Sequence, residues 1–510
     1  MRFLVAPFLL AAVCTAHAVA LPVTTALGYD DARHLLTRTG FAATQAEIER
    51  YAGLTREQAV KKLLAESTRT ALTPPPSWAA DSDVFAQRPG VGASEMERKR
   101  FQQEETRKGL ELRGWWVTEM LSTPSPLTER MTLFWHNHFV SSQQKVKLAE
   151  LMYRQNVTLR ANALGDFGEL LHAVARDPAM VVYLDSVQNR KGTPNENFAR
   201  EVMELFTLGE GQYSEQDIKE AARAFTGWSI DRSTGEFTFR RLIHDDGVKT
   251  VLGRSGKLDG DQVLDILLAE RQTGEFITRK LWREFVSPNP DDAEVKRIAE
   301  RFRESRYDIK SALYALLTSD AFYAAENRAT LIKSPIDLVV GTLRQFDMRP
   351  SATIPFAVAA AAMGQNLFAP PNVRGWRGQD AWINSTTLLA RKQFLDRMFR
   401  AGDGGSQTFL ATDTSMVQPP GRSIMPAGAQ DPDAIRQIQF RRAMDRGLNS
   451  VHFDRTAWFE QFSSPANSDG HARAAIRLLL ATAPQNSLDL QEEPLGLVRS
   501  IVLDAAYQLK

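Results

Sequence analysis

The sequence predicts a mainly α-helical, multi-helix globular protein with a minor β hairpin. Apolar residues recur at helical spacing along most of the 510 residues, and only residues 236–243 alternate in the way that a half-buried strand does. The composition agrees, because 43% of the residues are hydrophobic and 24% are charged, an ordinary balance for a chain with a large core. The sequence contains no internal repeat.

The first 20 residues predict a cleaved signal peptide. Arg2 precedes an apolar run from Phe3 to Val13, and small residues then follow in the small-x-small pattern of a cleavage site. The run is shorter than the roughly 20 residues of a membrane span, although an uncleaved anchor is the alternative. Cleavage near Leu21 would also remove Cys14, the only cysteine, and with it disulfides and thiolate chemistry. We therefore expect an exported, periplasmic or extracellular protein with no membrane span in its mature chain.

Helix-start and helix-stop signals divide the rest of the chain. Thr44, Thr55 and Ser214 are expected to cap helices, the last two with Gln58 and Asp217 at the reciprocal position. Further helices are expected at residues 28–40, 95–121, 125–138, 148–163, 167–176, 260–270, 273–285, 292–304, 308–318, 335–346, 357–365, 385–399, 472–483 and 493–509.

These elements predict a main helical domain over residues 21–400, to which C-terminal helices of residues 434–510 pack. Residues 401–433 are rich in Gly, Ser and Pro and predict a loop insertion or disordered segment. Residues 236–243 predict one or two short strands, with residues 250–252 as a pairing partner.

The stretch from Thr193 to Gly209 is the most informative part of the sequence. Pro194 and Asn195 predict the start of a helix, and Gly209 predicts its end. At about 100° per residue, Asn197, Glu201 and Glu204 fall on one stripe with Arg200 beside it. The rest of the circumference is apolar, which predicts a largely buried helix. The stripe faces either water or an internal polar site, and the sequence leaves both open.

Scarce histidines suggest a metal site. The chain has eight histidines, and His136, His138 and His244 are proposed here as ligands of a divalent metal, with Glu201 or Asp245. Two histidines at i and i+2 diverge by about 200° in a regular helix, so this pair needs a frayed helix end. The alternative is that these histidines cap a helix or make buried hydrogen bonds.

The polar stripe supplies candidate catalytic residues. Glu204 is a candidate general base for a metal-activated water, Arg200 a candidate anion clamp, and Asn197 lies on the same stripe. An ordinary ion-pair ladder of Arg200 with Glu196 and Glu204 explains the same residues equally well.

The turn-rich segment of residues 370–384 is a candidate ligand-binding loop. Trp376 and Trp382, with Arg374, are able to contact a sugar ring or another flat ligand if the rings are exposed. Alternatively, the tryptophans fix the loop to the core. The sequence has no nucleophile elbow, Walker loop, dinucleotide fingerprint or His-Glu-x-x-His motif. A formal net charge of +1 and the lack of a basic run give no footprint for nucleic acid.

Taken together, these segments resemble the signatures of the bacterial domain-of-unknown-function family DUF1800. The resemblance covers most of the chain from about Tyr29 to Arg400, and Gly40-Phe41-Ala42 departs from it where members commonly have a second glycine. The resemblance implies export and a sulfatase-like companion protein, but no reaction. The segments that carry it are residues 134–139, 195–209, 224–228, 244–249 and 364–382.

Two hypotheses about function follow. The first is an exported metal-dependent enzyme of the hydrolase class, with the His/Glu/Arg set as its site. The second is a non-enzymatic envelope protein that binds a glycan or the sulfatase-like companion through the loop of Trp376 and Trp382. They differ in whether the histidines and acids meet in one cleft.

Overall fold

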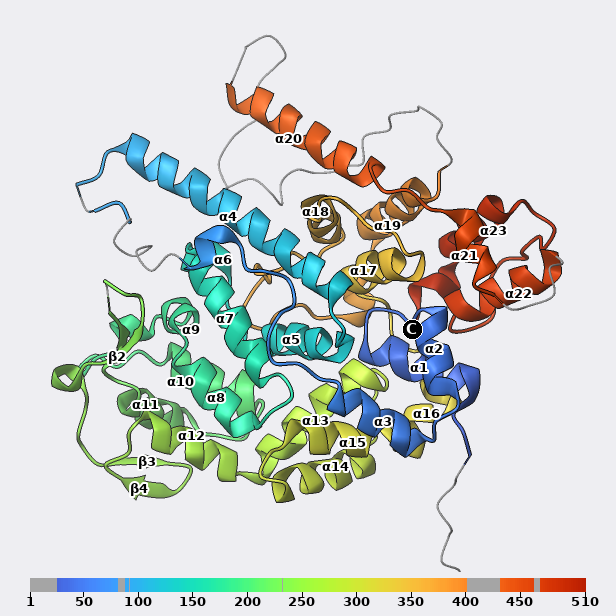
Figure 1. Ribbon diagram of the computed structural model, residues 1–510. Helices are drawn as coiled ribbons and strands as arrows, with labels where there is room; N and C mark the ends of the chain where they lie inside the picture. Colours follow the sequence, from blue (N-terminus) through green and yellow to red (C-terminus); the bar gives the residue numbers. More distant parts are fainter. Residues whose placement is uncertain (1–24, 81–87, 91, 232, 401–431, 463–467) are drawn as a thin grey trace, which may run out of the picture.

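The computed structural model describes residues 25–80, 88–90, 92–231, 233–400, 432–462 and 468–510. The predicted signal peptide, residues 1–20, and most of the predicted insertion, residues 401–433, lie outside the described residues. Helices account for 62% of the chain, and the described strands form two small antiparallel sheets (Figure 1). The prediction of a mainly α protein with a minor β component is confirmed.

The elements described in the first part of the chain are all helices. Its elements are α1 (Gly28–Thr39), α2 (Gln45–Ala52), α3 (Arg56–Ala65), η1 (Ser77–Ala80), α4 (Glu95–Ser122), α5 (Pro126–His138), α6 (Gln143–Val146), α7 (Ala149–Asn162), α8 (Phe167–Ala175), α9 (Pro178–Tyr183) and η2 (Ser186–Gln188).

The middle of the chain contains all the described strands. Its elements are α10 (Asn197–Glu201), η3 (Val202–Thr207), α11 (Glu215–Ala224), β1 (Trp228–Ile230), β2 (Phe237–Phe239), η4 (Arg241–Ile243), β3 (Lys249–Val251) and β4 (Arg254–Gly256).

Helices return for the remainder of the chain. They are α12 (Gly260–Ala269), α13 (Arg271–Phe285), α14 (Asp292–Glu304), α15 (Ile309–Leu317), α16 (Asp320–Tyr323), η5 (Ala325–Asn327), α17 (Pro335–Gln345), α18 (Ile354–Ala362), η6 (Gln379–Trp382), α19 (Ser385–Met398), α20 (Pro432–Asn449), α21 (Arg455–Glu460), α22 (Ser468–Leu479), α23 (Pro494–Leu503) and η8 (Ala505–Gln508).

Three helices begin with the side-chain caps that the sequence predicts. The hydroxyls of Thr44, Thr55 and Ser214 each accept a hydrogen bond from the backbone N–H three residues on, and that third residue returns a bond. Each pair therefore satisfies two backbone donors that the first helical turn leaves free.

The predicted strand pairing is wrong. β2 pairs antiparallel with β1, so that Trp228 lies opposite Phe239, whereas β3 pairs with β4. The alternating run also ends early, because residues 241–243 turn into the 3-10 helix η4. The reason is local: a short turn joins β1 directly to β2, closed by the hydrogen bond from the Asp231 N–H to the Glu236 carbonyl at 2.8 Å.

The centre of the molecule is α5, which is buried on nearly every side from Leu127 to His136. A helix enclosed in this way must satisfy its charged side chains internally. Glu129 does so by accepting two bonds from Arg160, at 2.6 and 2.9 Å, and one from the Trp116 indole at 2.7 Å.

Arg130, the next residue of α5, joins distant parts of the chain. Its guanidinium donates to the Gly40 carbonyl at 2.5 Å and forms an ion pair with Asp337 of α17. The other Asp337 oxygen accepts from Lys510, the last residue, at 2.7 Å. One buried cluster thus connects the segment after α1, the core helix, α17 and the C-terminus.

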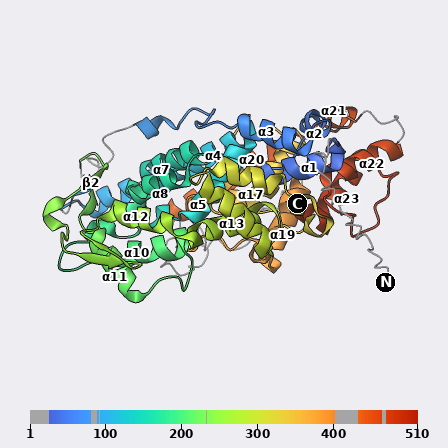
Figure 2. The ribbon, with the colours of Figure 1, turned by 90° about the horizontal axis from the view of Figure 1, so that it is seen from below.

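The molecule is elongated when it is seen from below (Figure 2). In both views β2 and α11 lie at one end, and α22 and α23 lie at the other. The C-terminal helices contact the main helices directly: the indole of Trp458 in α21, for example, donates to the Gln345 carbonyl of α17 at 2.7 Å. Within the described ranges, none of the helices has both the length and the apolar character that crossing a membrane requires.

Replacing Asp337 tests the buried cluster. Asp337→Asn leaves Lys510 without its ion-pair partner and Arg130 with only Glu284, at 3.3 Å, so the free energy of unfolding should fall by about 3–5 kcal/mol in urea titrations. Asp347→Asn, which alters an exposed pair with Arg349, is the matched control and should change it by less than about 0.5 kcal/mol.

The same cluster predicts how stability varies with pH. Burial opposes ionisation of Asp337, but Arg130 and Lys510 outweigh it and hold the pKa of this carboxyl below its usual range. A carboxyl with a lowered pKa stabilises the fold above its unfolded pKa of about 3.9 and loses that contribution as the pH falls. Between about pH 5 and about pH 2, the wild type should therefore lose more stability than Asp337→Asn. Parallel losses in the two proteins would contradict this assignment.

Candidate functional site

The stretch that the sequence singles out is not a uniform helix. It begins at Asn197, two residues after the predicted start, because the Asn195 side chain accepts from the Asn197 N–H at 2.9 Å and holds the preceding turn. From Val202 to Thr207 it is a π-helix, η3, and the Leu208 N–H donates back five residues to the Met203 carbonyl at 2.8 Å. Gly209, at φ +85°, ends it as predicted. π-helical turns are rare and often occur at functional sites.

Two side chains hold the carbonyls of this π-helix. The His138 Nε2–H donates to the Phe206 carbonyl at 3.1 Å, and Lys280 Nζ donates to the Leu205 carbonyl at 3.1 Å. Lys280 also donates to His138 Nδ1 at 2.9 Å, which requires that His138 carry its proton on Nε2. Burial lowers the pKa of Lys280 to about 7, and burial with the nearby Lys280 holds the pKa of His138 well below its usual value.

His136 is a core histidine. Its Nε2 accepts from the Phe368 N–H at 3.2 Å, and its ring packs against Trp116, Phe368 and Trp376. Burial lowers the pKa of His136 to about 3, so the ring stays neutral at any physiological pH. The structure therefore places it among aromatic rings rather than at a polar cleft.

His244 and Asp245 lie in the region of the two hairpins and have other partners. The His244 Nδ1–H donates to the Thr226 carbonyl at 2.8 Å, while Asp245 pairs with Arg223 at 2.8 Å. Arg223 holds the pKa of Asp245 below its usual value, at about 2.

The predicted metal-ligand set is not brought together. Across the described ranges of the chain, no three His, Cys, Asp or Glu side chains are grouped so as to hold a metal ion. The expected frayed helix end is also absent, because α5 stays helical through His138 and points His136 and His138 in different directions. Both rings are held in the core, which is the alternative that the sequence left open.

The two acids of the stripe do lie together, in different environments. Glu204 accepts a bond from the Tyr213 hydroxyl at 2.7 Å and an ion-pair bond from Arg374 at 2.8 Å. Glu201, one turn earlier and half-buried, makes no hydrogen bond or ion pair with any described residue. Burial, and then the charge of Glu204, raise the pKa of Glu201.

The other two residues of the stripe lie at the surface. Arg200 pairs with Glu196 at 3.4 Å and with Glu215 at 2.8 Å, but not with Glu204, so the predicted ladder forms only in part. Asn197 is exposed and donates to Asp185 at 3.3 Å.

The loop of residues 370–384 is fixed to the core. Trp376 and Trp382 are only 6% and 8% exposed, so their rings offer no stacking surface. The amide of Asn137, between the two α5 histidines, accepts from the Trp376 N–H at 2.7 Å and donates to the Trp376 carbonyl at 3.2 Å. This clamp places the neighbouring Arg374 against Glu204 and Glu210.

Three residues of the site were not identified from the sequence. Asn137, Tyr213 and Lys280 position the loop, Glu204 and the π-helix respectively. The position of Asn137 inside the His136–His138 motif could have identified it as a candidate. The sequence around Tyr213 and Lys280 contains no motif that would have identified them.

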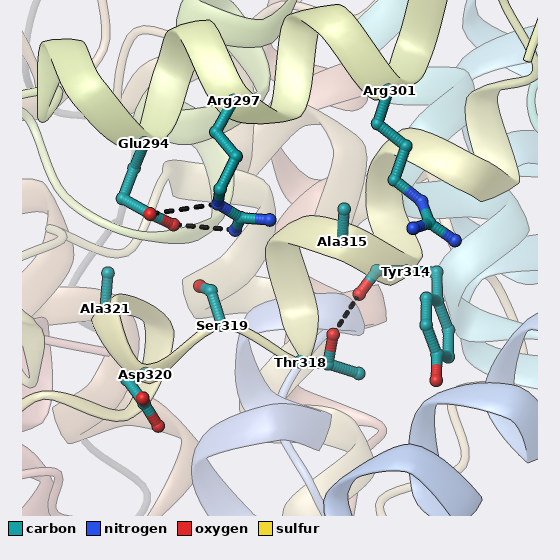
Figure 3. Close-up of a pocket in the computed structure, with 9 residues that line it drawn as sticks. All are labelled: Glu294, Arg297, Arg301, Tyr314, Ala315, Thr318, Ser319, Asp320 and Ala321. Carbon is teal, nitrogen blue, oxygen red and sulfur yellow. Dashed lines mark hydrogen bonds and ion pairs between the residues drawn. The ribbon is translucent and has the colours of Figure 1, made fainter. Parts of the chain in front are cut away.

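Two surface hollows lie near charged residues. One, of about 590 Å³, lies just before α10 and is lined by Gln188, Arg190 and residues 193–196. The other, of about 520 Å³, lies between α14, α15 and α16 (Figure 3). In it Arg297 is paired with Glu294, and the hydroxyls of Thr318 and Ser319 donate to carbonyls of their own helix. Neither hollow is lined by a predicted site residue, and of the two only the first adjoins the stripe, through Glu196.

Comparison with known proteins identifies the family. A family model described as a protein of unknown function, DUF1800, matches residues 34–503, nearly the whole chain. The chain belongs to the DUF1800 family. No curated protein and no solved structure matches it. The resemblance drawn from the sequence motifs is thereby confirmed, and in this DUF1800 protein the motif residues build the Asn137 clamp, the π-helix and the Glu201–Glu204 pair.

Gly375 tests the clamp. At φ +74°, a Cβ here would lie 2.7 Å from the Asn137 carbonyl oxygen, closer than atoms approach without contact strain. Gly375→Ala should therefore lower the free energy of unfolding by about 2–4 kcal/mol and release Arg374 from Glu204. Gly192→Ala has a similar φ, +87°, but no atom within 4 Å, and should cost only about 1–2 kcal/mol. Equal losses in the two variants, measured by urea unfolding, would show that backbone strain alone matters.

Proposed function

We propose that this protein is an exported enzyme of the hydrolase class in which Glu201 is the general acid–base. The observation that carries the proposal is the contrast between neighbouring carboxyls. Glu204 is held by Tyr213 and Arg374, while Glu201 is half-buried, has a raised pKa and makes no hydrogen bond or ion pair among the described residues. Titratable pairs whose environments separate their pKa values are typical of acid–base sites.

The two carboxyls would have different tasks. As a base, Glu201 takes a proton from water as its oxygen attacks the substrate, and as an acid it returns that proton to the leaving group. Glu204 keeps its orientation because Tyr213 and Arg374 fix both of its oxygens, and its charge stabilises positive charge that develops nearby. The open hollow before α10 reaches as far as Glu196, five residues before Glu201, and would be the approach for substrate.

The proposal does not use the histidines as metal ligands. His136, His138 and His244 each engage a ring nitrogen with the backbone, and His136 and His138 are enclosed in the core. The glycan-binding alternative loses its basis because the two indoles are buried. Export and a sulfatase-like companion protein remain part of the proposal, supported by the pattern of residues 1–20 and by the family resemblance.

A substrate panel tests the proposal. Purified wild-type protein and the Glu201→Gln variant are assayed against p-nitrophenyl carboxylate, phosphate and sulfate esters and against p-nitrophenyl glycosides. We expect turnover of at least one class and a loss of about 10²–10⁴-fold in kcat in Glu201→Gln. Glu300→Gln, which changes an exposed acid of α14 away from the site, is the matched control and should keep wild-type kcat.

The pH profile separates the two acids. Because the charge of Glu204 raises the pKa of Glu201, Glu204→Gln should move the acidic limb of the kcat profile to lower pH. If the wild type hydrolyses all four substrate classes no faster than Glu201→Gln does, the proposal is wrong.

A further inference from the structure

We propose that the end of the molecule formed by β2 and η4 docks on the surface of an anionic phospholipid bilayer. The surface concerned, here called the basic tip, consists of Lys191, Phe239, Arg240, Arg241 and Leu242. The proposal is independent of the acid–base function, because it uses none of the residues of that site.

Leu242 is the first observation. Its side chain is 98% exposed, more than that of any other large hydrophobic residue in the described parts of the chain, and Phe239 nearby is 45% exposed. A fully exposed leucine at the apex of a turn has no packing role, so its apolar surface is available to an external partner.

Backbone hydrogen bonds hold the turn that forms the basic tip. The Arg240 N–H donates to the Gly227 carbonyl at 2.8 Å, and the Lys191 N–H donates to the Ile243 carbonyl at 2.8 Å. The 3-10 helix η4 closes between them, with the Ile243 N–H bonded to the Arg240 carbonyl at 3.1 Å. Two chain segments therefore hold Leu242 in its exposed position.

The charge around Leu242 is the second observation. Arg190, Lys191, Arg240 and Arg241 are all exposed, and the side chains of Arg190, Lys191 and Arg241 have no ion-pair partner within the described ranges. Asp245 on the following turn is neutralised by Arg223. Asp246 is exposed as well, but the four cations outnumber it. The tip is therefore locally basic in a chain whose formal net charge is only +1.

This combination favours a bilayer over a protein partner. A stable protein interface covers about 800 Å² on each side, and one convex turn offers far less. A bilayer needs only a few apolar side chains that enter the interfacial region, with cations at the level of the anionic headgroups. β2, the strand that carries Phe239 and leads into η4, lies at one end of the long molecule in both views (Figures 1 and 2).

Docking through the tip would also orient the molecule. Arg190 lines the hollow before α10, and Lys191 contacts η4 through its backbone. The hollow would therefore face the headgroup region when the tip is bound.

Vesicle sedimentation of the full chain tests the proposal. The vesicles contain phosphatidylcholine alone or phosphatidylcholine with phosphatidylglycerol, and every variant keeps the same N-terminus, so differences report on the tip. We expect binding to the phosphatidylglycerol vesicles that weakens at high salt. Leu242→Asp should lower the partition coefficient at least about tenfold. Lys191→Glu with Arg241→Glu should lower it further.

Matched controls make the outcome decisive. Leu389→Asp changes an exposed leucine on α19, and Lys296→Glu with Arg301→Glu makes the same charge change on α14. Both should bind like the wild type, and circular dichroism should show that all variants are folded. The proposal is overturned if the wild type does not bind, if it binds both vesicle types equally, or if the tip variants and their controls bind alike. In the last case Leu242 would belong to a protein interface or to none.

Discussion

The buried ion pair of Arg130 with Asp337 is the constraint on which the rest of the structure depends. It joins residues 207 positions apart, and Gly40 and Lys510 share the same cluster. Removing Asp337 would leave Arg130 with only the partly exposed Glu284 as counter-charge, and breaking a buried pair in this way costs several times as much stability as losing a surface pair. Because Arg130 lies on α5, the cluster fixes the position of that helix along its axis and its rotation about that axis. The positions of the side chains further along α5 follow from this.

The candidate site follows from the end of α5. Asn137 clamps the backbone of Trp376 and so places Arg374 against Glu204, while His138 and Lys280 hold the carbonyls that the π-helix leaves free. The π-helix in turn sets where Glu204 stands relative to Glu201, because its wider turn rotates each residue less than an α-helix does. Arg374 is exposed, so its pair with Glu204 adds little stability and acts mainly by fixing an orientation.

Much of this was predictable from local patterns. Capping boxes and apolar periodicity predicted most helices, and the motif segments identified the family, because both depend on residues close together in the sequence. The structure does not bring the proposed metal ligands together, and the reason is physical. Spacing shows which ligand types are present, but His136 and His138 diverge on a helix that stays intact, and their partners Phe368, Phe206 and Lys280 lie far away in the sequence. The π-helix and the pairing of β2 with β1 likewise depend on tertiary contacts. The Glu201–Glu204 pair was found because i and i+3 residues share a face in any helix.

The pKa of Glu201 tests the proposed acid–base role most directly. Titration of protein labelled with ¹³C at the glutamate carboxyl, with the Glu201 signal assigned by its loss in Glu201→Gln, gives the pKa of this one group. We predict a midpoint above the usual value for glutamate, about 4.3. A midpoint at or below about 4.3 would show that the surroundings of Glu201 do not favour its protonated form, and would contradict the proposed acid–base role.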